Sequence, residues 1–247
     1  GDGPIDLVYV PGFLSHVEQD RGNTARSRNA RFAAIRSFFR YLEYKVPACL
    51  EQALAVRSLP MKKTDKALID YLTRDEMNAL LAAPDCTTVA GLRDRAMLHL
   101  TYAAGLRVSE LLALQMGDFS DRSLSTVRVL GKGRRERVLP LWKETQTVLR
   151  TWIAVRPSVQ VQELFVNREG RPLSRDGFAH RLAVHVAAAA RKKPTLAEKR
   201  VTPHVLRHSC AMHTLEATGD IRKVSLWLGH ASLQSTEAYL RVDPAEK

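Results

Sequence analysis

Five side chains that suit the chemistry of a phosphodiester stand close together near the end of this 247-residue sequence. They are His204, Arg207, His208, His230 and Tyr239. An arginine fork matches the oxygens of a phosphate and stays charged. Histidine exchanges protons near neutral pH, and tyrosine can serve as a nucleophile. Together these residue types predict a site at which a tyrosine attacks a backbone phosphate.

Each of these residues, taken alone, has a more ordinary interpretation. A helical His–Arg pair usually lies on a solvated surface, a histidine after a glycine usually caps a helix, and a lone tyrosine usually packs half-buried. The combination, order and spacing of the five favour the chemical interpretation.

Helix signals indicate how these side chains are positioned. The pair Thr202-Pro203 is typical of a helix start, with an N-cap and a proline at the first helical position. From that start, His204 and Arg207 are three residues apart and share one helix face. A second helix is expected over residues 221–228, and a third carries Tyr239.

An upstream arginine, Arg107, follows a predicted helix over residues 91–104 that Gly105 ends. It lies at a junction between helices, where rigid elements can direct a guanidinium into a cleft. A surface pair between Arg107 and Glu110 is an equally good interpretation of the local sequence.

A lysine, Lys132, lies in the turn of a predicted β-hairpin. Residues 125–130 and 137–141 alternate in polarity, and a glycine stands on each side of Lys132. The lysine can reach a DNA groove from there, although a basic turn is also common in hairpins. Arg134 and Arg135 are its rivals.

These motifs together resemble those of the tyrosine recombinases. The resemblance rests on H-x-x-R at residues 204–207, L-G-H at 228–230, a tyrosine at 239, G-L-R-V-S-E-L-L-A-L at 105–114 and G-K-G-R-R-E-R-V-L-P-L at 131–141. It implies that the catalytic residues are Arg107, Lys132, His204, Arg207, His230 and Tyr239. It also implies supporting roles for Glu110, which would orient an arginine, and for His208.

The resemblance implies a mechanism of strand cleavage and rejoining. Arg107 and Arg207 would hold the phosphate, His230 would donate a further hydrogen bond, and Tyr239 would form a 3′-phosphotyrosine. Lys132 would protonate the departing 5′-oxygen, and His204 would accept the proton of the phenol. Neither a metal, a nucleotide nor any other cofactor is expected, because the sequence has no H-E-x-x-H motif, P-loop or carboxylate cluster.

The fold class implied by the resemblance is mainly α with a small antiparallel β-sheet (α+β). A helical core-binding domain over residues 1–58, truncated at its N-terminus, would precede a basic linker over 59–67 and a catalytic domain over 68–247. Helical spacing independently predicts helices at residues 10–19, 25–44, 143–155 and 175–191. A short strand is expected at residues 164–166.

Charge points to a polyanionic partner. Lysine and arginine total 38 against 26 acidic residues, a formal net charge of +12. The expected DNA contacts are Arg26, Arg28, Arg31, Arg36, Lys62, Lys63, Arg134, Arg135, Arg191, Lys192, Lys193 and Arg200. The expected partner is double-stranded DNA with inverted-repeat core sites, on which the protein assembles as a dimer or tetramer, alone or with a sister recombinase.

No membrane span or secretory signal is expected, and the three cysteines show no metal-ligand spacing. These features predict a cytoplasmic, nucleoid-associated protein.

Three other functions share some of these features. A type IB topoisomerase uses a similar set of residues to relax DNA, although His204 and the short chain argue against it. A DNA-binding regulator with an inactive site would explain the charge without needing all six groups. An RNA-binding protein is compatible with the charge, but no aromatic stacking motif is visible.

Overall fold

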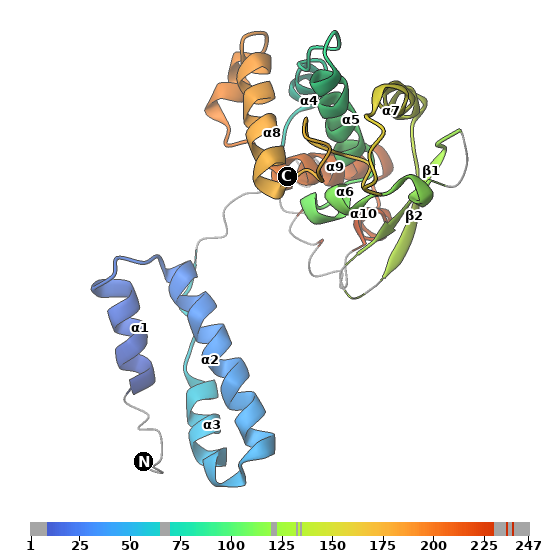
Figure 1. Ribbon diagram of the computed structural model, residues 1–247. Coiled ribbons are helices and arrows are strands. Elements are labelled where there is room, and N and C mark those ends of the chain that lie inside the picture. The colour runs from blue at the N-terminus through green and yellow to red at the C-terminus, as the bar shows by residue number, and fades with distance from the viewer. Residues whose placement is uncertain are drawn as a thin grey trace. The chain divides into compact units, whose positions relative to one another are not determined.

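The protein is described by a computed structural model of residues 9–64, 70–119, 123–131, 133, 135–229, 236 and 239. The chain divides into an N-terminal unit, Gly1–Ala67, and a C-terminal unit, Leu68–Lys247. Helices predominate, and the described residues contain one two-stranded antiparallel sheet (Figure 1). The predicted fold class is therefore confirmed.

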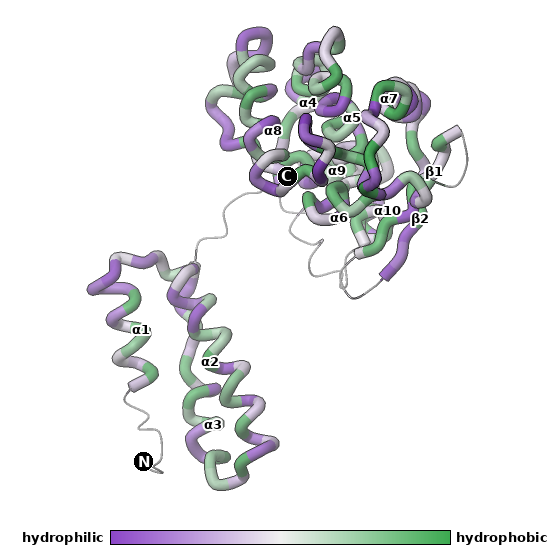
Figure 2. The backbone as a smooth tube through the Cα atoms, viewed as in Figure 1, coloured by the Kyte–Doolittle hydropathy of each residue, from purple (hydrophilic) through white to green (hydrophobic). Residues whose placement is uncertain are grey.

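The N-terminal unit is helical. Its elements are α1 (Tyr9–Gln19), α2 (Ala25–Lys45), the 3-10 helix η1 (Pro47–Cys49) and α3 (Leu50–Ser58). The side chain of Thr24 caps α2 by accepting a hydrogen bond from the Ser27 amide at 3.3 Å. Hydrophilic and hydrophobic residues alternate along α2 (Figure 2), because one face lies over a small core while the other carries arginines.

The C-terminal unit has seven α-helices among its described residues. They are α4 (Arg74–Leu81), α5 (Val89–Ala103), α6 (Val108–Ala113), α7 (Lys143–Val155), α8 (Arg175–Ala190), α9 (Pro203–Thr218) and α10 (Ile221–Leu228). The 3-10 helices are η2 (Met116–Asp118) and η3 (Pro194–Glu198). Helix α5 packs against both α7 and α9, and every residue from 96 to 106 is buried. A helix that is buried all round is a rigid base for the loop that follows it.

The hairpin consists of β1 (Thr126–Leu130) and β2 (Glu136–Pro140). Their antiparallel register pairs Thr126 with Pro140 and Leu130 with Glu136. The strand expected at residues 164–166 is wrong, since that segment makes only an isolated bridge between Val166 and Pro172. Its apolar residues are buried in the core without a ladder of backbone hydrogen bonds.

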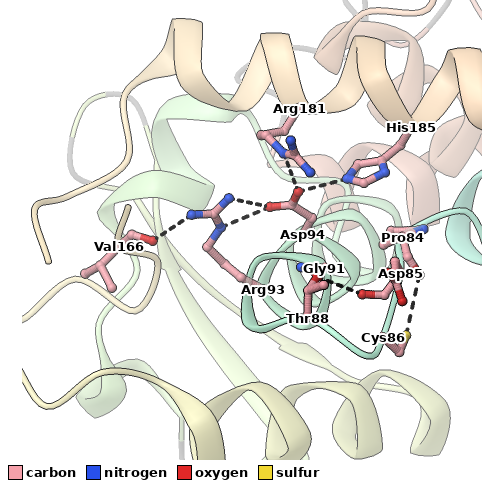
Figure 3. Close-up of polar contacts among 10 residues, drawn as sticks. All are labelled: Pro84, Asp85, Cys86, Thr88, Gly91, Arg93, Asp94, Val166, Arg181 and His185. Atoms are coloured by element: carbon pink, nitrogen blue, oxygen red, sulfur yellow. Dashed lines mark hydrogen bonds and ion pairs between the residues drawn. The ribbon is translucent and has the colours of Figure 1, made fainter. Parts of the chain in front are cut away.

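A buried carboxylate, Asp94 on α5, fastens α8 to the centre of the C-terminal unit (Figure 3). One carboxylate oxygen accepts hydrogen bonds from Arg93 at 2.7 and 2.9 Å, and the other contacts Arg181 Nε at 2.6 Å and His185 Nε2 at 2.8 Å. Burial alone would raise the pKa of Asp94, but the hydrogen bond with His185 and the positive charge of Arg93 hold that pKa below its usual value.

A second buried carboxylate, Glu76, connects α4 to the segment before α9. It completes a capping box with Thr73 and also accepts hydrogen bonds from Thr195 and Lys199, each at 2.6 Å. Burial opposes ionisation, but these hydrogen bonds and the nearby charge of Lys199 lower the pKa of Glu76 to about 2. Helix η3 and Lys199, which precede α9, are thereby held against α4.

No helix in the described parts of the chain is long and apolar enough to span a bilayer. Among the same residues, no group of three or more His, Cys, Asp or Glu side chains is arranged to hold a metal ion.

Candidate active site

Arg207 is a buried arginine at the centre of the candidate site. Thr202 caps α9 and Pro203 occupies its first turn, as predicted, so α9 begins at a defined residue and Arg207 lies in its second turn. Its Nη1 donates to the Gly105 carbonyl, and its Nη2 donates to the Leu228 carbonyl at 2.7 Å. Arg207 therefore joins the ends of α5 and α10 to α9.

The approach of these helix ends requires a glycine at position 105. Gly105 has a φ of +56°, and a Cβ there would lie 2.5 Å from Leu228 Cδ2. Burial and the nearby positive charge of Arg107 lower the pKa of Arg207 to about 10. The guanidinium nevertheless remains protonated at neutral pH.

Arg107 is the N-cap residue of α6, directly after the turn at Gly105. Its amide donates to Glu110 Oε2 at 2.9 Å and its Nη1 donates to Glu110 Oε1 at 2.7 Å. Because a third of its side chain is exposed, Arg107 can still reach a ligand while Glu110 holds it. The expected pair with Glu110 exists, but its carboxylate is buried rather than on the surface, and it lies beside Arg207; that Arg107 binds a ligand in a cleft stays a prediction.

Glu110 is shared by three arginines. Besides Arg107, it accepts hydrogen bonds from Arg137 Nη1 at 3.2 Å and Nη2 at 2.8 Å, and its Oε2 lies 3.8 Å from Arg207 Nη1. Burial would raise the pKa of Glu110, but the hydrogen bonds from Arg137 and Arg107 hold it below its usual value. The carboxylate is therefore ionised and balances part of the surrounding positive charge.

Tyr239 is buried, and its hydroxyl lies 2.7 Å from His208 Nδ1. Burial raises the pKa of Tyr239 to about 12, although the positive charges of Arg207 and Arg107 act in the opposite direction. Burial, with the nearby His204 and Arg207, lowers the pKa of His208. A neutral His208 can accept the hydrogen bond of the phenol.

The structure brings four of the predicted catalytic residues into one region of the C-terminal unit. Arg107, Arg207 and Tyr239 interact electrostatically, and His204 is exposed with its ring centre 6.4 Å from that of His208. Lys132, His230 and the rival Arg134 lie outside the described residues.

The predicted DNA contacts within the described residues differ in exposure. The exposed ones are Arg26, Arg31, Lys62, Lys63, Arg135, Arg191, Lys192 and Arg200. Lys62 pairs with Glu18 at 2.6 Å and Lys193 with Asp75 at 3.0 Å. Arg28 and Arg36 are partly buried, with their guanidinium carbons 5.5 and 5.7 Å from the centre of the Phe32 ring. These two arginines contribute to packing as well as to charge.

Two features of the site were missed from sequence. Arg137 was interpreted only as a strand residue, although it alternates with Leu139 and Leu141 and so belongs to the inward face of β2. That alternation was the available signal. The contact of His208 with Tyr239 had no signal of its own, because local spacing does not encode a contact between residues 31 positions apart.

Comparison with known proteins agrees with this geometry. Residues 70–246 match the model of the phage integrase family. The y4rC protein of Sinorhizobium fredii is 40% identical over 98% of this chain and 73% of its own length. The tyrosine recombinase XerD of Listeria monocytogenes is 35% identical over 96% of this chain and 78% of its own length.

Solved structures of low sequence identity share the fold. XerH recombinase bound to palindromic difH substrate superimposes with a TM-score of 0.76 at 22% identity, covering 98% of this chain and 70% of that one. A lambda integrase fragment bound as a dimer to a core site gives a TM-score of 0.67 at 17% identity, covering 97% and 82%. Because the family model and these sequence relatives match nearly the whole C-terminal unit and nearly the whole chain, respectively, the chain belongs to the phage integrase family and is a tyrosine-type site-specific DNA recombinase.

Proposed function

We propose that the chain cuts and rejoins DNA through a phosphotyrosyl bond formed by Tyr239, without a metal ion or ATP. One observation carries this proposal: the phenol of Tyr239 interacts electrostatically with the positive charges of Arg207 and Arg107. Glu110 holds Arg107 in place. A phosphoryl transfer needs its negative charge neutralised, and two preorganised guanidinium groups supply that neutralisation.

The reaction is a transesterification. The Tyr239 oxygen attacks the phosphorus as the bond to the 5′-oxygen breaks, leaving a 3′-phosphotyrosine and a free 5′-hydroxyl. Arg107 and Arg207 bind the non-bridging oxygens, His230 donates a further hydrogen bond, and Lys132 protonates the departing oxygen. A 5′-hydroxyl of another strand reverses the step. The phosphotyrosyl ester conserves the energy of the original bond, so rejoining needs no nucleotide.

His204 and His208 have different proposed roles toward the hydroxyl group of Tyr239. His208 holds the phenol in the DNA-free protein. A proton taken up there would add a buried positive charge beside Arg207, which is costly. His204 is exposed, so solvent can stabilise its charged form. We therefore assign proton acceptance during cleavage to His204 and placement of the resting phenol to His208.

The proposed partner is double-stranded DNA. XerH is bound to a palindromic difH substrate and lambda integrase forms a dimer on a core site in their solved structures. We propose that this chain likewise binds inverted-repeat core sites as a dimer or tetramer, and that it acts at the nucleoid. Exposed basic residues, among them Arg26, Arg31 and Arg191, support contacts to the DNA backbone.

The chemistry is tested with nicked duplexes that carry candidate core sites from DNA flanking the gene. Cleavage next to the nick releases a short strand and traps a covalent complex, which a denaturing gel detects. The complex is expected to form in EDTA and to be lost in Tyr239→Phe, while the DNA dissociation constant is retained.

A matched control is Tyr102→Phe. Tyr102 is likewise a buried tyrosine, with its hydroxyl 2.7 Å from a histidine of α9, His213, and a pKa raised to about 12 by burial. This variant is expected to retain trapping. Binding without any covalent product in the unmodified protein would favour a DNA-binding regulator, and relaxation of plasmid without site preference would favour a topoisomerase.

A further inference from the structure

Arg137 is an almost buried arginine of the β-hairpin that faces the candidate site. Only 11% of its side chain is exposed, and its two terminal nitrogens donate to the two oxygens of Glu110 at 3.2 and 2.8 Å. A two-point contact of this kind fixes direction as well as distance. It ties β2 to the first turn of α6, where Arg107 begins the helix.

Arg137 thereby shares the charge of Glu110 with Arg107 and Arg207. Without Arg137, the full negative charge of the carboxylate would face Arg107 at 2.7 Å and Arg207 at 3.8 Å. Both guanidinium groups would then be neutralised more strongly and would attract a phosphate less. The positive charge of Arg137 offsets the negative charge of Glu110. The carboxylate can therefore orient Arg107 without cancelling the positive charge that attracts a phosphate.

Arg137 also lies against the two glycines that precede Lys132 and His230. A Cβ built on Gly229 would come within 3.1 Å of Arg137 Cδ, and one on Gly131 within 3.5 Å of both Arg137 Nη1 and Glu110 Oε1. A side chain at either glycine would therefore crowd Arg137. One side chain therefore touches the hairpin end, the end of α10 and the carboxylate that holds Arg107.

We propose that Arg137 is a positioning residue for strand cleavage, acting through Glu110 on Arg107. This inference rests on the proposed function for its kinetic consequence, but its structural content does not depend on cleavage.

The kinetic test compares Arg137→Met with the unmodified protein on the nicked duplex. Trapping is expected to slow by about 10- to 100-fold, the range that a small misplacement of catalytic groups produces. The DNA dissociation constant is expected to change by less than about threefold, because Arg137 is not on the surface. Arg137→Lys keeps the charge but not the fork, so we expect an intermediate rate.

Arg128→Met is the matched control. Arg128 lies on β1 directly opposite Val138, and its side chain is 54% exposed and pairs with Asp118. Its loss removes the same charge from the same hairpin, and the cleavage rate is expected to stay within about threefold. Equal losses in Arg128→Met and Arg137→Met would overturn the proposal, since they would reflect hairpin charge alone.

The substrate provides a second kinetic readout. A methylphosphonate at the scissile position carries no negative charge and depends less on the arginine clamp. On this substrate the difference in rate between the unmodified protein and Arg137→Met is expected to shrink at least about fivefold. An unchanged difference would show that the substitution acts through general destabilisation, which thermal unfolding of both variants measures directly.

An NMR measurement separates this proposal from the proposed function. The Nε–Hε signals of Arg107 and Arg207, assigned by Lys substitutions, are expected to shift in Arg137→Met and not in Arg128→Met. Unchanged signals would overturn the positioning role even in an active enzyme. Shifted signals in a protein that never becomes attached to DNA would support the positioning role while rejecting the proposed chemistry.

Discussion

At the scale of the residue, the two histidines of α9 illustrate how environment separates similar groups. His204 and His208 are one turn apart, yet His204 is exposed while His208 is partly buried against Tyr239. Burial lowers the pKa of His208, so it stays neutral at pH 7 and can accept the hydrogen bond of the phenol. Burial also keeps Tyr239 protonated in the absence of DNA.

Substitution of each histidine tests this division. His204→Asn is expected to slow trapping by about 100-fold or more, the usual contribution of a proton acceptor. That loss should shrink as pH rises, because a larger fraction of Tyr239 is then ionised without help. His208→Asn is expected to cost less than about tenfold. Rapid-quench trapping between pH 6 and 9 measures both, and the reverse order of effects would assign proton acceptance to His208.

At the scale of the element, buried carboxylates hold the helices that carry the site. Asp94 joins α5 to α8, Glu76 joins α4 to the segment before α9, and Glu110 joins α6 to β2. Each pairs with several donors, which offsets the cost of removing the charge from water. The arginines proposed to be catalytic are therefore carried by elements that buried carboxylates join to their neighbours.

Acid should weaken the Glu76 junction over a definite pH range. Its pKa is about 2 in the folded protein and 4.5 as an ordinary glutamate, so its contribution is complete above pH 4.5 and is lost as pH falls toward 2. At about 1.4 kcal/mol per pKa unit, the loss amounts to roughly 3 kcal/mol. Urea unfolding at pH 7, 4.5 and 3 measures it.

Glu76→Gln should be destabilised at pH 7 and should lose less stability on acidification than the unmodified protein. The neighbouring Asp75→Asn is the control, because Asp75 is 75% exposed and makes only a surface pair with Lys193. A parallel decline of the unmodified protein and Glu76→Gln between pH 4.5 and 3 would contradict the prediction.

At the scale of the whole molecule, the exposed arginines of the N-terminal unit and the candidate active site of the C-terminal unit have different proposed roles. Arg26 and Arg31 are exposed on α2, whereas Arg28 and Arg36 also pack over Phe32. The first two can therefore be removed with little effect on the small core. Their proposed role is to contact DNA phosphates, which contributes affinity without sequence information.

The double variant Arg26→Ala/Arg31→Ala should weaken DNA binding and reduce its salt dependence. Each phosphate contact contributes about 0.9 to the slope of log K against log salt concentration, so the slope should fall by roughly 1.8. The trapping rate at saturating DNA should not change. Fluorescence anisotropy from 50 to 300 mM salt measures the slope. Lys45→Ala, at the far end of α2, should leave it nearly unchanged.

The sequence by itself determined where most helices begin and end and which residue types are present for catalysis. The caps at Thr24, Thr73 and Thr202 and the glycines at 105 and 229 mark where helices begin and end, and the structure agrees within a few residues. These signals are readable because capping and backbone conformation depend on neighbours in the chain.

Only the tertiary structure decided which of these residues meet. Arg207 binds the carbonyl of Gly105, 102 residues earlier in the chain, and Arg137 binds Glu110 from another element. The burial of Tyr239 against His208 likewise depends on how a later segment returns to α9. Such contacts follow from the packing of whole helices, which local spacing does not encode, and that packing converts separate side chains into one site.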